Sequence, residues 1–320
     1  MKLAIARPAA SRILVIKLGA LGDFVQAMAA AAAIRAHHID ATITLLTTAA
    51  YADLARRAPY FDEVWIDERP QLWMPRALLA LRHRLRSAGF TRVYDLQTSD
   101  RSSAYFHLLG SGLLGPGARP EWSGIARGAS HPHDNPRRDL MHTLDRQAEQ
   151  LRRAGITEVK PPDLAWAATD IDRFALPDRF IVLVPGGAAH RPAKRWPSGA
   201  FGELAAGLAA RRITPVVIGS GAEAALGSDI ASACAETRDL IGQTALGDVV
   251  TLGQQALHAV GNDTGPMHLL AAAGCKATVL YSAASDPALT APRGTGVVVL
   301  RRADLADLAV AEVAATLAIG

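Results

Sequence analysis

The chain has 320 residues, of which 50% are hydrophobic, so it is long enough for two packed cores rather than one. The formal net charge of +4 is compatible with an anionic substrate or a membrane surface, but the arginines are scattered and form no basic arm, which argues against nucleic-acid binding. Two cysteines, Cys234 and Cys275, build no disulfide framework and favour a reducing compartment. The longest purely apolar run, 27–34, is much shorter than a membrane span, and no signal peptide is evident. We therefore expect a cytoplasmic protein that can still lie on a membrane face.

Strand-like and helix-like segments alternate through the first half of the chain. A turn at 18–22 leads into a helix over 23–36, and short apolar runs predict buried parallel strands at 12–17, 42–47, 64–66 and 92–96. The stretch 114–142 is rich in glycine, proline and basic residues and shows no periodicity, so we interpret it as a long surface loop. A helix over 142–154 closes this half.

Prolines between 160 and 177 punctuate an interdomain connection, after which the alternation restarts. Strands are expected at 180–184, 214–218, 239–241, 258–260 and 277–281, with helices at 199–211, 266–273 and 303–317. The pattern predicts an α/β protein with two doubly wound Rossmann-like domains, at 1–165 and 166–302, and a C-terminal helix at 303–320. In such folds, ligands bind beyond the carboxyl ends of the strands, and the cleft between two domains is the expected site.

The strand at 180–184 is followed by Gly186 and Gly187, and then by Lys194 and Arg195. Glycines after a strand let backbone N–H groups approach an anion, and the two cations add mobile positive charge. This pattern indicates a phosphate site, with a loop that carries two solvated cations as the alternative.

The strand at 214–218 is followed by Gly-Ser-Gly-Ala-Glu-Ala at 219–224, which fits the G-x-G-x-x-A dinucleotide fingerprint. Asp239 lies 20 residues after Gly219, but it is expected to precede its strand, whereas a ribose-binding acid should end one. Binding of a nicotinamide dinucleotide is therefore disfavoured. Glu223 is a candidate for binding ribose hydroxyls, with an acid at a helix start as the alternative.

The third turn with unusual residues follows the strand at 258–260. Asp263, Thr264 and Gly265 lead into Pro266, which suits the first turn of a helix. Asp263 or Thr264 could act only as a helix cap. Because the cap, the glycines and His268 coincide at the carboxyl edge of a sheet, we favour a ligand site.

Five stretches, taken in order, resemble glycosyltransferase family 9, the ADP-heptose:lipopolysaccharide heptosyltransferases. They are ILVIKLGALGD, VPGGAAHRPAKRWP, VIGSGAE, LIGQTALGDVVTLGQQA and VGNDTGPMHLLAAAG, and they span residues 13–274. The last stretch and AKRWP are specific, whereas GALGD alone is weak. The resemblance implies a GT-B fold, with an N-terminal acceptor-binding domain and a C-terminal donor-binding domain facing a central cleft. It also implies inverting transfer with no metal or other cofactor.

The same motifs imply roles for single residues. Asp23 of GALGD resembles the general base, with a helix cap as the alternative, and Lys194 of AKRWP resembles the donor-phosphate lysine. Glu223 of GSGAE resembles the ribose-binding glutamate, and the segment from Gln243 to Leu246 resembles the one beside the nucleobase. The other expected donor-binding residues are Gly186, Gly187, Arg195, Asp263, Thr264, Gly265 and His268.

The acceptor that the resemblance implies is an anionic glycolipid, the lipid A–core precursor, so its site should be electropositive and belong to the first domain. Lys17 and Arg101 at strand ends are expected to contribute, with simple solvation as the alternative for Lys17. Arginine pairs well with carboxylate and phosphate, so Arg127, Arg137 and Arg138 of the 114–142 stretch are further candidates, unless they only aid solubility. No nucleic-acid partner is expected, and contact with the cytoplasmic face of the inner membrane would be peripheral.

Two patterns resemble metal ligands. Asp170 and Asp172 form a D-x-D pair, but no strand precedes it, so capping of the next helical turn is the better account. His131, His133 and Asp134 could ligate a metal, but in a loop rich in proline and arginine we interpret them as solvated or facing the acceptor. We expect no metal site.

The leading hypothesis is an inverting, metal-independent glycosyltransferase that moves heptose from ADP-L-glycero-D-manno-heptose to the inner core of lipopolysaccharide. One alternative is a family member with another nucleotide-sugar donor, because the motifs fix the diphosphate better than the sugar or the base. Another is a non-catalytic nucleotide-sugar binding module, although such a module has no need of a carboxylate such as Asp23 opposite Lys194.

Overall fold

The structure is a computed structural model that describes residues 11–71, 73–110, 119–187 and 191–317. Contacts divide the described chain into two compact units. The first holds the segment up to Gly19, Ala27–Leu140 and Leu144–Lys160, and the second holds Ala20–Gln26, Met141–Thr143 and the chain from Pro161 onward. The main division therefore follows Lys160, whereas the sequence predicted a boundary after residue 165.

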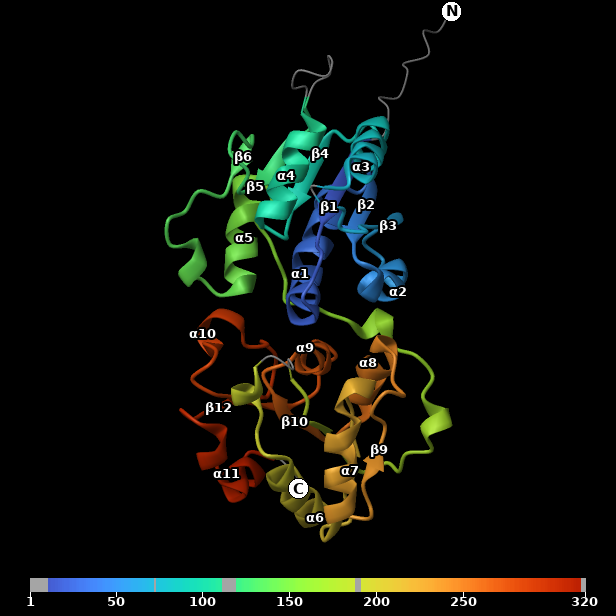
Figure 1. The fold of residues 1–320 in the computed structure, drawn as a ribbon, viewed down its shortest axis with the longest axis vertical. Coiled ribbons are helices and arrows are strands. Elements are labelled where there is room, and N and C mark those ends of the chain that lie inside the picture. Colours follow the sequence, from blue (N-terminus) through green and yellow to red (C-terminus); the bar gives the residue numbers. More distant parts are fainter. Residues whose placement is uncertain (1–10, 72, 111–118, 188–190, 318–320) are drawn as a thin grey trace, which may run out of the picture. The chain divides into compact units, whose positions relative to one another are not determined.

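The first unit contains a six-stranded parallel sheet in the order β3-β2-β1-β4-β5-β6 (Figure 1). The central strand β1 has four consecutive buried residues, as expected for a strand that is covered on both faces. The strands are β1 (Arg12–Ile16), β2 (Thr42–Thr47), β3 (Glu63–Ile66), β4 (Arg92–Asp95), β5 (Glu121–Gly124) and β6 (His131–Pro132). The helices are α1 (Leu21–His37), α2 (Ala49–Arg57), α3 (Pro75–Ser87), α4 (Asp100–Leu109) and α5 (Thr143–Arg153).

The second unit contains another six-stranded parallel sheet, in the order β12-β11-β10-β7-β8-β9. Its strands are β7 (Phe180–Val184), β8 (Thr214–Val217), β9 (Arg238–Asp239), β10 (His258–Asn262), β11 (Ala277–Tyr281) and β12 (Val297–Arg301). Its helices are α6 (Ser198–Ala209), α7 (Ala224–Ala233), α8 (Leu246–Gln255), α9 (Gly265–Ala272), α10 (Pro287–Thr290) and α11 (Val310–Ala315).

Both sheets have the same topology when their strands are numbered from the start of each unit. The order is 3-2-1-4-5-6 in each, which is the order of a dinucleotide-type Rossmann sheet. The prediction of two doubly wound Rossmann-like domains is therefore confirmed.

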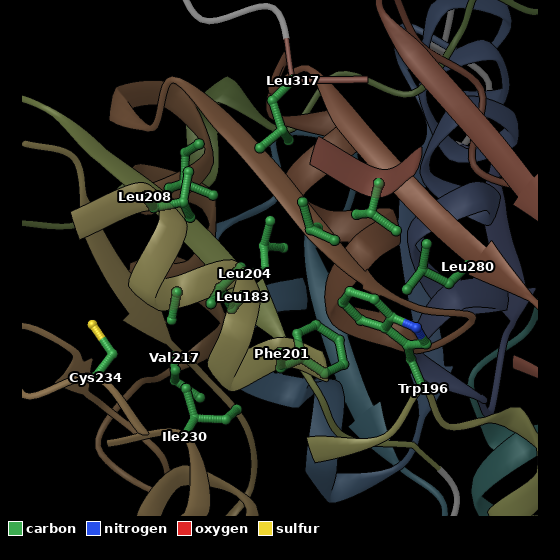
Figure 2. Close-up of a cluster of buried hydrophobic side chains, with 14 of the residues drawn as sticks. Leu183, Trp196, Phe201, Leu204, Leu208, Val217, Ile230, Cys234, Leu280 and Leu317 are labelled. Atoms are coloured by element: carbon green, nitrogen blue, oxygen red, sulfur yellow. The ribbon is translucent and has the colours of Figure 1, made fainter. Parts of the chain in front are cut away.

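A hydrophobic cluster of the second unit packs α6, α7 and α11 against its sheet (Figure 2). Leu183 of β7 and Val217 of β8 pack with Phe201 and Leu204 of α6, and all four side chains are at most 2% exposed. The ring of Trp196 meets that of Phe201 edge to face, with the centroids 4.9 Å apart. Aromatic pairs of this geometry add to the free energy of apolar burial. Trp196 is thus fixed in the core, and it holds the segment that precedes α6.

The expected long loop at 114–142 was wrong for its described part. Residues 114–118 lie outside the described residues, but β5 and β6 extend the first sheet, and Arg138–Leu140 forms a 3-10 turn. Pairing to β4 overrides the poor strand propensity of the sequence Glu-Trp-Ser-Gly, because Trp122 fills the core at 0% exposure.

Three expectations in the second half also need correction. The last strand, β12, was missed, and the helix expected at 303–317 is instead a 3-10 turn, Leu305–Asp307, followed by the short α11. Residues 318–320 lie outside the described part of the chain. Asp239 ends β9 rather than preceding a strand, so the argument used against dinucleotide binding was wrong. Its carboxylate accepts a hydrogen bond from the Ile241 N–H at 3.0 Å, which caps the strand end.

Candidate functional site

A pocket of about 920 Å³ lies at the carboxyl ends of β7, β8 and β10 in the second unit. β7 and β10 are the neighbours at which the strand order reverses, the place where such sheets bind ligands. The volume is in the range of small-molecule sites. Ten of the predicted site residues line it: Asp23, Gly186, Gly187, Lys194, Arg195, Glu223, Leu246, Asp263, Thr264 and Gly265.

Glu223 joins the loop after β7 to the loop after β8. Its Oε1 accepts a hydrogen bond from the Gly187 N–H at 2.8 Å, and its Oε2 accepts from the N–H and the hydroxyl of Ser220 at 2.8 and 3.0 Å. A Cβ on Gly186 would lie 1.9 Å from Oε1, so only glycine fits unless Glu223 moves. Glu223 is therefore both an acid in a capping box and part of the pocket wall.

Asn262 fixes three segments of the pocket at once, although the sequence analysis assigned it no role. Its side-chain N–H groups donate to the carbonyl oxygens of Pro185 and Gly186 at 2.8 and 3.2 Å, and its Oδ1 accepts from the Trp196 N–H at 2.9 Å. The side chain is 0% exposed, so these bonds replace all contact with water. Its position at the end of a buried strand, before an acid, was the available signal.

Lys194 is not the mobile loop cation that the sequence suggested. Its Nζ lies 2.6 Å from Oδ2 of Asp263, and the two side chains are only 12% and 9% exposed. The neighbouring Trp196 anchors this segment, because its Nε1–H donates to the Leu308 carbonyl at 3.0 Å. The ammonium group is therefore held at the pocket wall before any ligand binds.

The ionisation of Asp263 follows from this pair. Burial alone would raise the pKa of the Asp263 carboxyl, but the hydrogen bond and the charge of Lys194 hold that pKa below its usual value. The Asp263 carboxyl is therefore ionised at neutral pH. A phosphate oxygen that binds Lys194 would compete with this carboxylate.

Two arginines add positive charge to the same wall. Arg195 donates from Nη2 to the Gly187 carbonyl at 2.6 Å, while its buried Nε–H has no partner among the described residues. Arg191 also lines the pocket and was missed by the sequence reasoning, although it stands three residues before Lys194. Residues 188–190 of the same stretch lie outside the described residues.

Asp23 enters the pocket through the first turn of α1, which belongs by its contacts to the second unit. Two glycines permit the close approach of α1 to α9. A Cβ on Gly22 would lie 2.7 Å from Cδ2 of His268, and a Cβ on Gly265 would lie 2.7 Å from Cβ of Leu21. A carboxylate and an ammonium group, Asp23 and Lys194, thus line one pocket although they come from distant parts of the sequence.

His268, predicted to bind the donor, lies behind the wall and not on it. The side chain is 7% exposed, and its Nδ1 lies 3.1 Å from Nε2 of Gln26. Because that amide nitrogen can only donate, Nδ1 accepts, and the other ring nitrogen carries the proton. Burial lowers the pKa of His268 to about 4, so the ring is neutral. In the structure it supports the packing of α1 on α9.

The predicted nucleobase segment contributes only in part. Thr244 and Leu246 of the predicted segment line the pocket, together with Val249, which the sequence analysis did not single out. Gln243 is exposed, does not line the pocket, and donates from Nε2 to the Asp239 carbonyl at 2.9 Å. Asp239 does not line the pocket either, and its carboxylate packs against Gly227, where a Cβ would lie 2.4 Å from Oδ2. A dinucleotide-type acid is therefore lacking from the described lining.

Lys17 and Arg101, the expected acceptor residues at strand ends, both donate hydrogen bonds to backbone carbonyl groups of the first unit. Lys17 is 4% exposed and donates to the Leu96 carbonyl at 3.3 Å, so it is not the open cation that was expected. Burial raises the pKa of the adjacent Asp95 to about 6, against the opposing effect of its backbone hydrogen bonds and of Lys17. Arg101 donates to the Pro70 carbonyl at 3.2 Å, which ties α4 to the chain that follows β3.

The three arginines of the 114–142 stretch have different surroundings. Arg127 and Arg137 are exposed. The side chain of Arg138 is 15% exposed and pairs with Asp139 at 2.7 Å, and burial lowers its pKa. Its Nε and Nη2 have no partner among the described residues, which leaves unused donors beside the sheet.

The two patterns that resemble metal ligands are engaged elsewhere. Asp170 accepts a hydrogen bond from the Asp172 N–H at 2.7 Å, at the start of the 3-10 turn Asp172–Phe174. His133 lies 3.5 Å from Glu149, and Asp134 pairs with Arg153. Within the described ranges, no group of three or more histidine, cysteine or acidic side chains could hold a metal ion.

Comparison with known proteins gives a consistent set of relatives. Residues 78–309 match the model of glycosyltransferase family 9 (heptosyltransferase). Lipopolysaccharide heptosyltransferase 2 of Escherichia coli strain K12 is 27% identical over 313 residues, which cover 88% of this chain and 85% of that protein.

Solved structures of similar proteins have the same fold. The ADP-heptose lipopolysaccharide heptosyltransferase II of E. coli has a TM-score of 0.78 at 24% identity, covering 96% of this chain and 98% of that one. The E. coli heptosyltransferase WaaC with ADP has a TM-score of 0.74 at 21% identity, covering 95% and 98%. The predicted GT-B-type fold is thereby confirmed.

Proposed function

The chain belongs to glycosyltransferase family 9, and from that premise we propose that this glycosyltransferase transfers heptose from ADP-L-glycero-D-manno-heptose to the inner core of lipopolysaccharide. One observation carries the proposal: Asp23 and Lys194 line the same pocket at the switch point of the second sheet. The names of the relatives, which are lipopolysaccharide and lipooligosaccharide heptosyltransferases, support the choice of donor and acceptor.

We propose that the donor diphosphate binds at Lys194 and Arg195. The pocket lining contains three cations, Arg191, Lys194 and Arg195, and three carboxylates, so the diphosphate is favoured only on the cationic side. The start of α9 adds the N–H of Gly265 and the positive end of the helix dipole, which favour an anion. Glu223 would meet the ribose, and Leu246 with Val249 would offer an apolar surface to the base.

The reaction would be a single displacement. The acceptor hydroxyl oxygen forms a bond to the anomeric carbon, while the bond from that carbon to the phosphate oxygen breaks. The hydroxyl proton passes to the Asp23 carboxylate, and the ADP that leaves carries the bond's electron pair. Attack from the face opposite the leaving group inverts the anomeric configuration. Fixed cations near the leaving diphosphate stabilise the charge that develops there.

We also propose that no divalent metal or other cofactor takes part. The positive charge that a metal would supply to the diphosphate is already present in Lys194 and Arg195, and Lys194 is held in place by Asp263. In this proposal two side-chain cations and the Gly265 N–H at the start of α9 take the role that a metal ion would otherwise have at the diphosphate.

The acceptor is proposed to be an anionic glycolipid, the lipid A–core precursor, bound by the first domain. Exposed Arg127 and Arg137, with the partly buried Arg138, would contact its carboxylates and phosphates. We propose a cytoplasmic enzyme that reaches this substrate at the inner membrane. Both cysteines are free, and none of the described helices is long and apolar enough to cross a membrane.

The proposal is tested by measuring ADP release and product mass with a panel of substrates. We expect turnover with ADP-heptose and a lipopolysaccharide core that lacks heptose, and none with UDP-glucose or GDP-mannose. Transfer from another nucleotide sugar would favour the alternative donor. Tight donor binding without product on any core would favour the non-catalytic binding module.

A further inference from the structure

The helix α3 and the two residues before it expose large apolar side chains. Trp73 is 78% exposed, Leu79 is 59% exposed, and Met74 is 46% exposed. Trp73 is the one exposed tryptophan of the five in the chain, since Trp122 and Trp196 are buried and Trp65 and Trp166 are partly buried. Tryptophan is costly to leave in water, so a cluster of such side chains indicates a surface that is covered in use.

Arginines lie close to this apolar cluster in the sequence. From Arg69 to Tyr94 the sequence has no aspartate or glutamate, but it contains six arginines besides His83. Arg76 lies three residues from both Trp73 and Leu79, which places it between them on the outer face of the helix. Arg82 continues the positive charge along α3. The patch is therefore apolar and cationic together, with no carboxylate in its own segment.

The patch stands on a rigid base. The inner face of α3 packs into the core of the first unit through Leu85, which is 0% exposed, with Leu81 against the same cluster. The chain before it is tied down where Arg69 donates to the Leu18 carbonyl at 2.9 Å and Arg101 donates to the Pro70 carbonyl at 3.2 Å. The Met74 N–H donates to the Gln71 carbonyl at 2.8 Å. The exposed side chains are thus displayed on an ordered element and do not fold back onto the core.

We infer that the α3 patch, defined as Trp73, Met74, Arg76, Leu79, Arg82 and His83, docks this protein on an anionic lipid bilayer. Tryptophan and leucine side chains enter the boundary between headgroups and acyl chains, while arginines pair with the phosphates beside them. Charge complementarity selects this occupant, because the patch has cations and no acid. Single-stranded nucleic acid needs aromatic platforms for successive bases, and here one tryptophan stands among aliphatic side chains.

The inference is tested by sedimentation of the full chain with vesicles that contain no glycolipid acceptor and no donor. Vesicles of phosphatidylcholine with phosphatidylglycerol should bind the protein, and vesicles of phosphatidylcholine alone should bind it much less. Trp73→Ser with Leu79→Ser should lower the partition coefficient by about tenfold or more. Arg76→Gln with Arg82→Gln should lower it by about fivefold per arginine on anionic vesicles only.

The matched control is Ile39→Ser with Leu140→Ser, since both side chains are 76% exposed and lie outside the patch. This control should bind vesicles as the wild type does. In a second measurement, brominated lipid should quench the emission of the wild type, and Trp73→Phe, which keeps the apolar ring, should bind but lose that quenching.

Equal binding of the Trp73/Leu79 variant and the control would overturn the inference, as would quenching that persists in Trp73→Phe. Preferential binding of a single-stranded RNA oligonucleotide over anionic vesicles would also overturn it. Since sugar transfer is not measured, these outcomes are independent of whether the proposed reaction is correct.

Discussion

Replacing Lys194 by alanine tests the donor site most sharply. The change removes the cation that is proposed to face the leaving diphosphate and leaves its partner Asp263 without a counter-charge. The Asp263 side chain is 9% exposed at the wall of the pocket, so water can replace the lost interaction only in part. Catalysis and stability should therefore both change, and they can be separated.

The loss of one fixed electrostatic contact at a leaving group lowers turnover by about 100- to 1,000-fold, and we expect that range for Lys194→Ala. Unpairing a buried carboxylate costs about 3–5 kcal/mol in a closed core. Because this pair lines an open pocket, a cost of about 1–3 kcal/mol in the free energy of unfolding is expected. The Lys194–Asp263 pair lowers the pKa of the folded-state carboxyl. Its stabilisation is therefore present above the ordinary carboxyl pKa of 3.8 and is lost as the pH falls through the lower pKa of the folded state. The variant should lose less stability in acid than the wild type.

The assay combines ADP release under saturating donor with urea denaturation at neutral and acidic pH. The double variant Lys194→Ala with Asp263→Asn is the control, because it removes the unpaired charge but does not restore the cation. It should recover most of the lost stability and none of the lost turnover. Turnover of Lys194→Ala within a few-fold of the wild type would refute the donor-phosphate role. A stability change that is unaffected by Asp263→Asn would refute the role of the pair.

Four further predictions concern other parts of the site. Asp23→Asn keeps the size and most of the capping ability of the side chain but removes the base. Donor affinity measured by calorimetry should therefore persist, while the rate of transfer falls by at least about 100-fold. Normal turnover would show that Asp23 acts only as a helix cap. Gly186→Ala must displace Glu223, since the new Cβ would lie 1.9 Å from its Oε1, and the donor Kd should rise by about tenfold or more. Gly199→Ala is the control that should leave the donor Kd unchanged, because a Cβ added there meets no neighbouring atom within 4 Å. Excess chelator should leave activity unchanged, whereas loss that magnesium or manganese restores would contradict the metal-free mechanism. Arg127→Gln with Arg137→Gln should raise the acceptor KM and weaken its dependence on salt concentration, while the donor Kd stays constant. An unaltered acceptor KM at all ionic strengths would show that neither arginine binds the acceptor.

The sequence predicted the central strands of both sheets, which are mostly buried. β1 and β7 are continuous apolar runs between turns, and such runs specify central strands of a parallel sheet without any tertiary information. β5 and β6 could not be predicted in the same way. They are short, carry glycine or proline, and exist because their backbones pair with the neighbouring strand. β12 was also missed, but its run of three valines and a leucine is typical of a strand, so it could have been predicted from the sequence.

Residue types at strand ends predicted which loops form the pocket, but not what each side chain does there. Lys194 and Glu223 were recognised by their motifs, yet the partners that hold them, Asp263 and Gly187, depend on how separate strands align. Lys17 shows the limit clearly. A lysine at the end of a strand suggests an open cation, and only the packing around it shows that it is 4% exposed. The burial of a charged side chain depends on its neighbours in space, and these neighbours are often far apart in the sequence.

The mechanism as a whole is tested most directly by the anomeric configuration of the product. Purified protein, ADP-L-glycero-D-manno-heptose and a lipopolysaccharide core that lacks heptose are incubated, and the isolated product is examined by mass spectrometry and proton NMR. We predict the mass increase of one heptose and an anomeric configuration opposite to that of the donor, with no product from Asp23→Asn in the same assay. A product that retains the donor configuration, or no added heptose under conditions in which ADP-heptose binds, would contradict the single displacement with Asp23 as the base.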